Sequence, residues 1–328
     1  VGQGIFSGLT YNDDNGQAIR TEYCVSLQSV GNMPKLASGG RVMFYKCSAL
    51  KSVGNLSSLT VIPDSMFEGA SSLTSLGDLS SVTSISKRAF HSCSSLKRLN
   101  NLSSLRTIGE RAFCNCSALV NVSSLSGVTS IGDSAFYGCR SLTSLGSLSS
   151  IISIDQWAFA NCTSLESVGN MNYLTSLGNR AFQGCTSLIS VGNMPKLTQI
   201  GENAFANCSA LASVGSLSSV TSIGDHAFLS CGSLKTIGSM SKVQTIGMGA
   251  FASCKSLVSI TSLNSVTKIG TRAFSDCTAL KTVGDLRNVT SIGTNAFYNC
   301  PYVTLRVLRN SYAARYAQSK GISYVYIQ

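Results

Sequence analysis

The sequence predicts a solenoid of short stacked coils that is mostly β-structure. One motif recurs every 23 residues without insertion or deletion. Only 12% of the 328 residues are charged and 44% are hydrophobic, whereas about a quarter of the residues in an average globular protein are charged. A fixed period of this size indicates repeats that are too small to bury a core alone and therefore stack on their neighbours.

Two residue types mark the period most clearly. Phenylalanine recurs at twelve positions: Phe44, Phe67, Phe90, Phe113, Phe136, Phe159, Phe182, Phe205, Phe228, Phe251, Phe274 and Phe297. Three residues after each stands Cys or, once, Ala: Cys47, Ala70, Cys93, Cys116, Cys139, Cys162, Cys185, Cys208, Cys231, Cys254, Cys277 and Cys300, with Cys24 one coil earlier. Counted from this Cys as position 0, apolar residues recur at positions 3, 6, 9, 12, 15 and 19. We expect these columns to form the buried core.

Each coil is predicted to hold short strands joined by tight turns. In Ser141–Leu148 three leucines recur every third residue around Gly146, which favours a short strand that bends at the glycine. Stacked strands then pair with the coils on either side and form a parallel sheet. The second apolar stretch, Val128–Ile131, ends at Gly132, and the following Asp133–Phe136 is predicted to form a short helical or 3₁₀ turn.

The repeat changes at both ends of the chain, where a solenoid needs caps over its terminal coils. We expect one domain over residues 1–328, with an N-terminal cap at 1–23, twelve repeats at 24–300 and a C-terminal cap at 301–328. Asp13, Asp14, Asn15 and Gly16 predict a turn in the first cap.

The C-terminal cap is predicted to contain a short helix and a final strand. The stretch Asn310–Ala317 has the composition of a capped helix, and Gly321 is placed to end it. Residues Ile322–Ile327 are expected to form the last strand.

The repeat resembles a known family. The segment Leu217–Cys231, LSSVTSIGDHAFLSC, is similar to the BspA-like leucine-rich repeats of bacterial surface proteins, and the resemblance covers roughly residues 24 to 300. This chain departs from the family at Gly192-Asn193-Met194, where an apolar residue and Pro usually follow the first strand. The resemblance implies a curved, right-handed leucine-rich-repeat coil with a parallel sheet on its concave face. It also implies an exported, adhesin-like protein, and it names no ligand.

The expected location is extracellular or at the cell surface. The chain contains no stretch of eighteen or more apolar residues, so we expect no membrane span within it. A secretion signal and an anchor are expected to lie outside the given chain.

Thirteen cysteines raise the question of disulfides or a metal site. Twelve of them share one repeat position and none forms a close Cys-x-x-Cys pair, so we favour a ladder of buried thiols. Disulfides between adjacent coils are the alternative. Cys114 alone lies off this column, and it is either a partly buried residue or an exposed reactive thiol.

The sequence gives little support for catalysis, and we expect neither a metal nor a cofactor. The two histidines, His91 and His226, occupy different repeat positions, and no recurring carboxylate accompanies both. Asp225 precedes His226, but we interpret this pair as a solvated surface pair. A hydrolase, the least favoured alternative, would need a site centred on one of these histidines.

The candidate binding residues lie in columns that are expected to face solvent. Position 4 of the first strand varies most, with apolar residues in the middle of the chain and basic residues at the flanks. The candidates are Lys97, Arg98, Val120, Thr143, Glu166, Ile189, Lys235, Val258 and Lys281, with Trp157 as a possible aromatic anchor. Position 8 carries a column of Asn, Ser and Asp, for which we favour a structural role.

Charge points to acidic partners. The net charge is +11, and four arginines share position 18: Arg88, Arg111, Arg180 and Arg272. Such a field would steer anionic glycans, acidic matrix proteins or a wall polymer, and it also keeps a repeat protein soluble. Nucleic acid is not expected, because the basic residues are scattered and lack interleaved aromatic residues.

The sequence therefore favours a non-enzymatic binding or adhesion module. Its ligand would be a protein or glycan of host or microbial origin, bound by the concave sheet face or by the basic columns. The alternative is a structural spacer that projects another domain, and the oligomeric state is left open.

Overall fold

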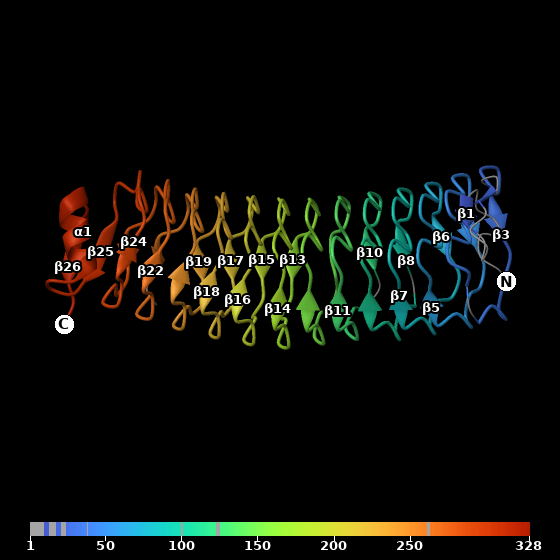
Figure 1. Ribbon diagram of the computed structural model, residues 1–328, viewed down its shortest axis with the longest axis horizontal. Helices are drawn as coiled ribbons and strands as arrows, with labels where there is room; N and C mark the ends of the chain where they lie inside the picture. The colour runs from blue at the N-terminus through green and yellow to red at the C-terminus, as the bar shows by residue number, and fades with distance from the viewer. Residues whose placement is uncertain are drawn as a thin grey trace. The chain divides into compact units, whose positions relative to one another are not determined.

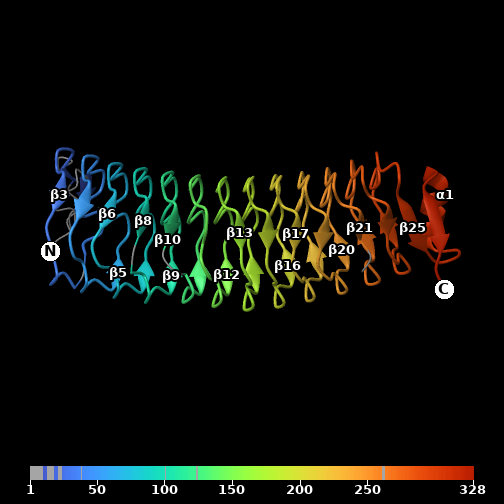
Figure 2. The same ribbon diagram turned by 180° about the vertical axis from the view of Figure 1, so that it is seen from behind.

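The structure is a computed structural model that describes residues 10–12, 18–20, 24–37, 39–99, 101–122, 125–260 and 263–328. It divides into two compact units: unit 1 comprises Val1–Ile151 and Ala158–Leu165, and unit 2 comprises Ile152–Trp157 and Glu166–Gln328. Within each unit, successive coils lie side by side and form a β-solenoid (Figure 1, Figure 2). The organisation of residues 1–328 as one domain stays a prediction.

Most coils contribute a two-residue strand at positions 5 and 6, here called the first strand, whereas Ser144 forms only an isolated bridge with Asn121. In unit 1 the first strands are β3 (Ser29–Val30), β4 (Ser52–Val53), β6 (Ser75–Leu76), β8 (Arg98–Leu99) and β10 (Asn121–Val122). In unit 2 they are β13 (Ser167–Val168), β15 (Ser190–Val191), β17 (Ser213–Val214), β19 (Thr236–Ile237), β21 (Ser259–Ile260) and β23 (Thr282–Val283). In most of them a solvent-facing polar residue precedes a buried apolar one, as a half-buried strand requires.

A second strand follows at positions 14 and 15 of the coil. In unit 1 the second strands are β5 (Val61–Ile62), β7 (Ser84–Ile85), β9 (Thr107–Ile108) and β11 (Ser130–Ile131). In unit 2 they are β12 (Ser153–Ile154), β14 (Ser176–Leu177), β16 (Gln199–Ile200), β18 (Ser222–Ile223), β20 (Thr245–Ile246), β22 (Lys268–Ile269) and β24 (Ser291–Ile292).

The predicted parallel pairing is confirmed in both sets of strands. Paired Cα atoms belong to residues one period apart, such as Ser190 with Ser213 in the first strands and Ser222 with Thr245 in the second. Because the period never varies, every side chain faces the equivalent side chain of the next coil. Residues 23 apart in the sequence are therefore the true neighbours in this fold.

The turn that follows the second strand differs from the expected 3₁₀ turn. In every coil between residues 42 and 299, positions 18 and 22 have positive φ, as at Arg88 (54°) and Ser92 (60°). Every second backbone N–H then points to the next coil, so Arg88, Phe90 and Ser92 donate to the carbonyls of Glu110, Ala112 and Cys114 at 2.8 Å. The N–H groups of the residues between them donate within the turn, as His91 N does to Arg88 O. The alternating backbone thus makes a third set of bonds between coils.

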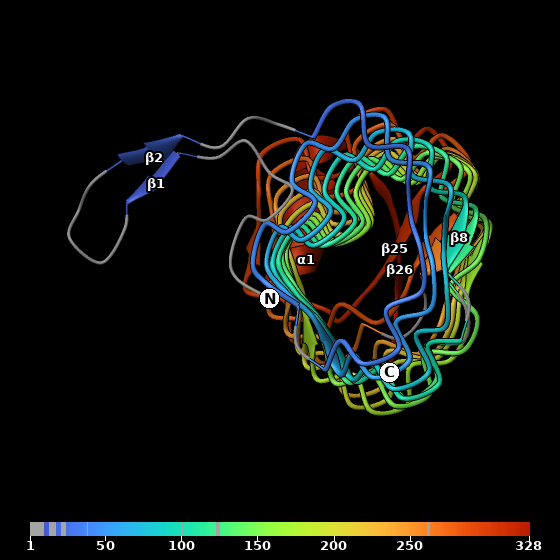
Figure 3. The ribbon, with the colours of Figure 1, turned by 90° about the vertical axis from the view of Figure 1, so that its right-hand side faces the viewer.

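The buried columns form the core as predicted, and the phenylalanine side chains are among its largest buried groups. The coils of each unit enclose an interior (Figure 3). In unit 1 the rings from Phe44 to Phe159 stack with centroids 5.0–5.3 Å apart. In unit 2 the rings from Phe182 to Phe297 stack at 5.2–5.4 Å. Offset and stacked aromatic pairs add to the stability that burial provides.

The cysteine column is a ladder of thiols without disulfides among the described residues; its members are buried as expected, except for the half-buried Cys24. Several of these thiols donate to the carbonyl of the Phe 26 residues earlier, such as Cys93 to Phe67 O at 3.1 Å. Burial raises the pKa of the Cys254 thiol to about 12, so this thiol stays protonated at neutral pH. The ladder therefore contributes packing and weak hydrogen bonds.

Both ends depart from the repeat. At the N-terminal end β1 (Thr10–Asn12) pairs with β2 (Ala18–Arg20) in antiparallel fashion, and the predicted turn at Asp13–Gly16 lies outside the described residues. The C-terminal end contains the predicted helix and final strand: β25 (Thr304–Val307), α1 (Tyr312–Lys320) and β26 (Ser323–Tyr326).

The C-terminal helix has both of its expected caps. The Ser311 hydroxyl accepts a bond from Ala314 N at 3.1 Å, and Gly321 ends the helix with φ 64°. Its face of Ala313, Ala314 and Ala317 is buried, and α1 packs against β24, β25 and β26. Among the described residues, no helix is long and apolar enough to cross a bilayer.

At Gly77, in position 7, the backbones of adjacent coils approach each other closely. A Cβ at Gly77 would lie 2.5 Å from Gly54 O, whereas a Cβ at the equivalent Gly31 meets nothing within 4 Å. We expect Gly77→Ala to lower the free energy of unfolding by about 2 kcal/mol, because backbone atoms must shift. Gly31→Ala is the matched control and should be neutral in the same urea denaturation series. Equal effects of the two substitutions would contradict the close approach.

Candidate functional site

The position-4 side chains form one row along the first strands of each unit. Most of their backbones are bonded directly, since the N–H of one residue donates to the carbonyl of the position-4 residue one coil earlier. In unit 1 this bond is 2.9 Å from Val120 N to Lys97 O and 3.0 Å from Thr143 N to Val120 O. Lys97 and Val120 are exposed, and Thr143 is half-buried. Arg98, at position 5 of β8, is also exposed.

The row of unit 2 comprises Glu166, Ile189, Ala212, Lys235, Val258 and Lys281. All except the half-buried Ala212 are exposed, and the exposed fractions of Ile189 and Val258 reach 54% and 43%. Two coils separate these two apolar residues, and Val258 lies between Lys235 and Lys281. The row therefore alternates apolar and basic residues here, instead of forming the continuous apolar middle that we expected.

A shallow groove of about 200 Å³ lies beside this row in unit 2. Lys235 and Ser259 line it, together with the turn from Ile237 to Met240 that follows β19. The groove is small, so it suits one sugar or one side chain of a longer ligand rather than a whole small molecule.

The polar column at position 8 is structural, as we favoured. The Asn170 side-chain oxygen accepts the Asn193 N–H at 2.9 Å, and that of Asn193 accepts the Ser216 N–H at 2.8 Å. Each side-chain amide oxygen thus accepts a backbone N–H from the turn of the next coil.

Trp157 does not join the first-strand row. It stands at position 18, in the turn after the second strand, with a left-handed backbone (φ 57°). The Arg180 guanidinium lies 4.9 Å from the centroid of its ring, and the side chain is half-buried. Its packing against Arg180 accounts for an aromatic residue at this position.

A second, larger groove lies over the turns of unit 2. It measures about 650 Å³ and is lined by residues of positions 17, 18, 21 and 22, among them His226, Arg272, Asp276 and Tyr298. Asp225 does not pair with His226 here, because its carboxylate accepts the Met248 N–H at 2.7 Å. The catalytic reading of that pair has no support.

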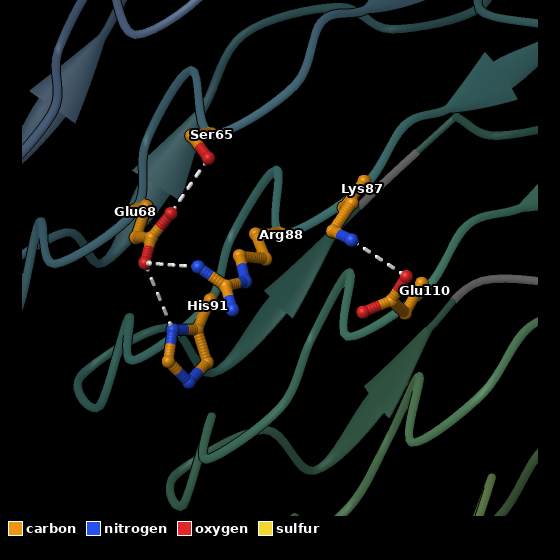
Figure 4. Close-up of polar contacts among 6 residues, drawn as sticks. All are labelled: Ser65, Glu68, Lys87, Arg88, His91 and Glu110. Carbon is orange, nitrogen blue, oxygen red and sulfur yellow. Dashed lines mark hydrogen bonds and ion pairs between the residues drawn. The ribbon is translucent and has the colours of Figure 1, made fainter.

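His91, in contrast, lies in a polar cluster that the sequence analysis missed. Its Nδ1 lies 3.2 Å from Glu68 Oε1, the Ser65 hydroxyl donates to Glu68 Oε2 at 2.6 Å, and an Arg88 nitrogen is 4.0 Å from Glu68 (Figure 4). Glu68 lies 23 residues before His91, so the repeat spacing was the signal that could have found it. Next to this cluster, Lys87 and Glu110 form an exposed pair at 2.7 Å.

The cluster changes the pKa values of both His91 and Glu68. A hydrogen bond with Cys114 and one with Glu68 raise the pKa of His91 to about 9, although burial opposes this. Burial raises the pKa of Glu68, but bonds from His91 and Ser65 and the nearby charges of His91 and Arg88 outweigh it and lower that pKa overall. His91 is therefore an imidazolium at neutral pH. Within the described part of the chain, no three His, Cys, Asp or Glu residues are placed to hold a metal ion.

Comparison with known proteins places these features in context. A family described as the BspA type leucine rich repeat region matches residues 22–120, 83–212 and 175–304. The structure is similar to a leucine-rich repeat protein from Bacteroides ovatus, with 25% identity, 97% of each chain covered and a TM-score of 0.57.

Two further solved structures show weaker likenesses. A leucine-rich cell surface protein from Faecalibacterium prausnitzii has 21% identity over 87% of this chain and 82% of that one, with a TM-score of 0.37. A leucine-rich repeat protein from Eubacterium ventriosum has 22% identity over 70% and 66% of the two chains, with a TM-score of 0.40. No curated protein matches this sequence.

Proposed function

Because this chain belongs to the family of BspA-type leucine-rich repeats, we propose that it is a non-enzymatic binding module of an exported or cell-surface bacterial protein. Its ligand is an acidic protein or glycan of host or microbial origin. The first-strand row of each unit is a contact surface. Lys97, with Arg98 beside it, belongs to that of unit 1, and Lys235 and Lys281 belong to that of unit 2.

The unpaired cations of this row are the observation that carries the proposal. Lys97, Arg98, Lys235 and Lys281 are exposed, and none of them forms an ion pair with another described residue. Stacked strands hold their side chains at a spacing of roughly 4.8 Å per coil. A row of fixed, uncompensated positive charges favours a polymer that carries repeated negative charges.

The apolar members of the row support a contact that is more than electrostatic. Ile189 and Val258 are largely exposed although they stand on rigid strands. Apolar groups that a ligand covers strengthen binding through the water they release. Such a ligand would include apolar groups between its acidic ones, as sugars and peptides do.

The test is a matched pair of charge reversals in unit 2. We expect Lys235→Glu with Lys281→Glu to weaken binding to an immobilised sulfated glycan or an acidic matrix protein about tenfold, since two favourable charge contacts become repulsive. The control, Lys242→Glu with Lys268→Glu, changes net charge equally at two exposed sites away from the row. Binding is compared by surface plasmon resonance at low and high salt, because ions screen exposed charges.

The outcomes separate the alternatives. Equal losses in both double variants would assign binding to net charge alone and contradict a site in the row. No binding by the unaltered chain to any acidic ligand would favour the structural spacer.

A further inference from the structure

The polar cluster at His91 extends to a cysteine. Glu68, His91 and Cys114 stand 23 residues apart, at position 21 of three consecutive coils of unit 1. Gly69 N donates to His91 O and Ser92 N donates to Cys114 O, both at 2.8 Å, so the backbones of the three coils are bonded beside these residues. Stacking therefore places a carboxylate, an imidazole and a thiol in one line.

The contacts along this line run in a consistent order. Glu68 accepts from His91 at 3.2 Å and from Ser65 at 2.6 Å, which fixes the carboxylate on one side of the imidazole. Cys114 hydrogen-bonds to His91 from the following coil. A carboxylate that orients an imidazole, which in turn contacts a thiol, is the arrangement that activates cysteine nucleophiles.

We propose that His91, positioned by Glu68, activates Cys114 and makes it the reactive cysteine of this chain, a site of modification by disulfides and small carbon electrophiles. His91 acts directly on the sulfur, and Glu68 is a positioning residue that acts through His91. The site is independent of the proposed binding face.

Its surroundings distinguish Cys114 from the thiol ladder. Cys93 and Cys116 are 0% exposed and donate to phenylalanine carbonyls, and burial raises the pKa of both thiols. Cys114 is 6% exposed, and the neighbouring His91 side chain is 25% exposed. Cys114 therefore stands beside a cation that is itself partly exposed, and reactive cysteines are found next to such cations.

Charged groups surround the pair. His91, with its pKa raised to about 9, is positive through the neutral range. Glu68 and Arg88 also interact here, and burial raises the pKa of the neighbouring thiols of Cys116 and Cys139. Glu68 compensates the charge of the imidazolium, and the imidazolium stabilises negative charge that develops on the sulfur of Cys114 as it reacts.

The chemistry is balanced without a cofactor. With a small disulfide, the Cys114 thiolate attacks one sulfur, a new disulfide forms, and the other half leaves as a thiolate that takes up a proton. With iodoacetamide, a carbon–sulfur bond forms while the carbon–iodine bond breaks and iodide leaves. In both reactions the sulfur supplies the electron pair.

The first experiment measures how fast iodoacetamide alkylates each cysteine of the folded chain, by peptide mass spectrometry over a range of pH. We expect Cys114 to react about tenfold faster than Cys93 near neutral pH, since an ordinary thiol of pKa about 8.5 is only a few per cent ionised there. His91→Gln should slow Cys114 about tenfold near neutral pH and shift its rate profile toward that of an ordinary thiol. Glu68→Gln should shift the profile in the same direction by less.

Lys87→Gln is the matched control, because it removes a charged group from the same turn without touching this line. It should leave the rate unchanged. A Cys114 that reacts no faster than Cys93, or a His91→Gln chain that reacts like the unaltered one, would overturn the proposal.

A second measurement needs no substitution near the histidine. The thiols of the folded chain that react rapidly with a small aromatic disulfide near neutral pH are counted in the unaltered chain and in Cys114→Ala. We expect Cys114→Ala to lose one such thiol, and identical counts would also overturn the proposal.

Discussion

Replacing Phe228 with alanine is expected to lower the free energy of unfolding by about 4 kcal/mol. Phe228 is 0% exposed, and its ring lies 5.3 Å from Phe205 and 5.2 Å from Phe251. The substitution removes two stacked contacts and leaves a cavity that the hydrogen-bonded coils cannot close. Urea denaturation followed by circular dichroism would measure the change, and in a repeat array it would also show whether neighbouring coils unfold together.

Phe297→Ala is the matched comparison at the end of the same stack. Phe297 is 5% exposed, stacks on Phe274 alone and meets Tyr316 edge-on at 6.3 Å. Phe297→Ala should lower the free energy of unfolding by less, because the C-terminal helix can move into the cavity that the substitution leaves. A loss of less than about 1 kcal/mol at Phe228 would contradict a continuous aromatic core.

His91 should make the stability of the chain depend on alkaline pH. Its pKa is about 9 in the folded chain and 6.5 when unperturbed, so folding favours the protonated ring. The resulting stability is fully present below about pH 6.5 and is lost as the pH rises through about 9. The shift corresponds to about 3 kcal/mol, and partial solvent screening reduces the expected effect to about 2 kcal/mol.

We therefore expect His91→Gln to destabilise the chain by about 2 kcal/mol near neutral pH and by little at about pH 10. Urea denaturation at both pH values checks this. Glu68→Gln should remove part of the same pH dependence, because the hydrogen bond with Cys114 raises the pKa of His91 more than that with Glu68 does. The double variant should cost less than the sum of the two single ones, because the two groups share one interaction. Equal destabilisation by His91→Gln at both pH values would contradict the ion pair.

The candidate binding row shows how far residue columns can be read from a sequence. Lys97, Ile189 and Lys281 are exposed where position 4 predicts, because the unbroken period assigns every residue to a face. The order along the row also follows from the period, which places Val258 between Lys235 and Lys281. Trp157 could not be placed by its column alone, since its contact with Arg180 depends on the path of the turn.

The cluster of Glu68, His91 and Cys114 was missed for a related reason. The residues next to His91 in the sequence give no sign of the cluster, because its neighbours in space are 23 residues away. The same spacing that predicts the stacked phenylalanines would have brought these three residues together. The left-handed turn also had a visible sign, in the Asn and Gly residues that recur at position 22, such as Asn115 and Gly138.

The amino-acid sequence was sufficient for the period, the buried columns, the parallel pairing of strands and the C-terminal helix. These follow from hydrophobic spacing and cap residues, which act locally and repeat in every coil. The left-handed turns, the groove beside Lys235 and the contacts of His91 were decided only when the coils stacked. Such contacts depend on where each turn directs its N–H groups and side chains, and neighbouring coils settle that direction through the bonds between them.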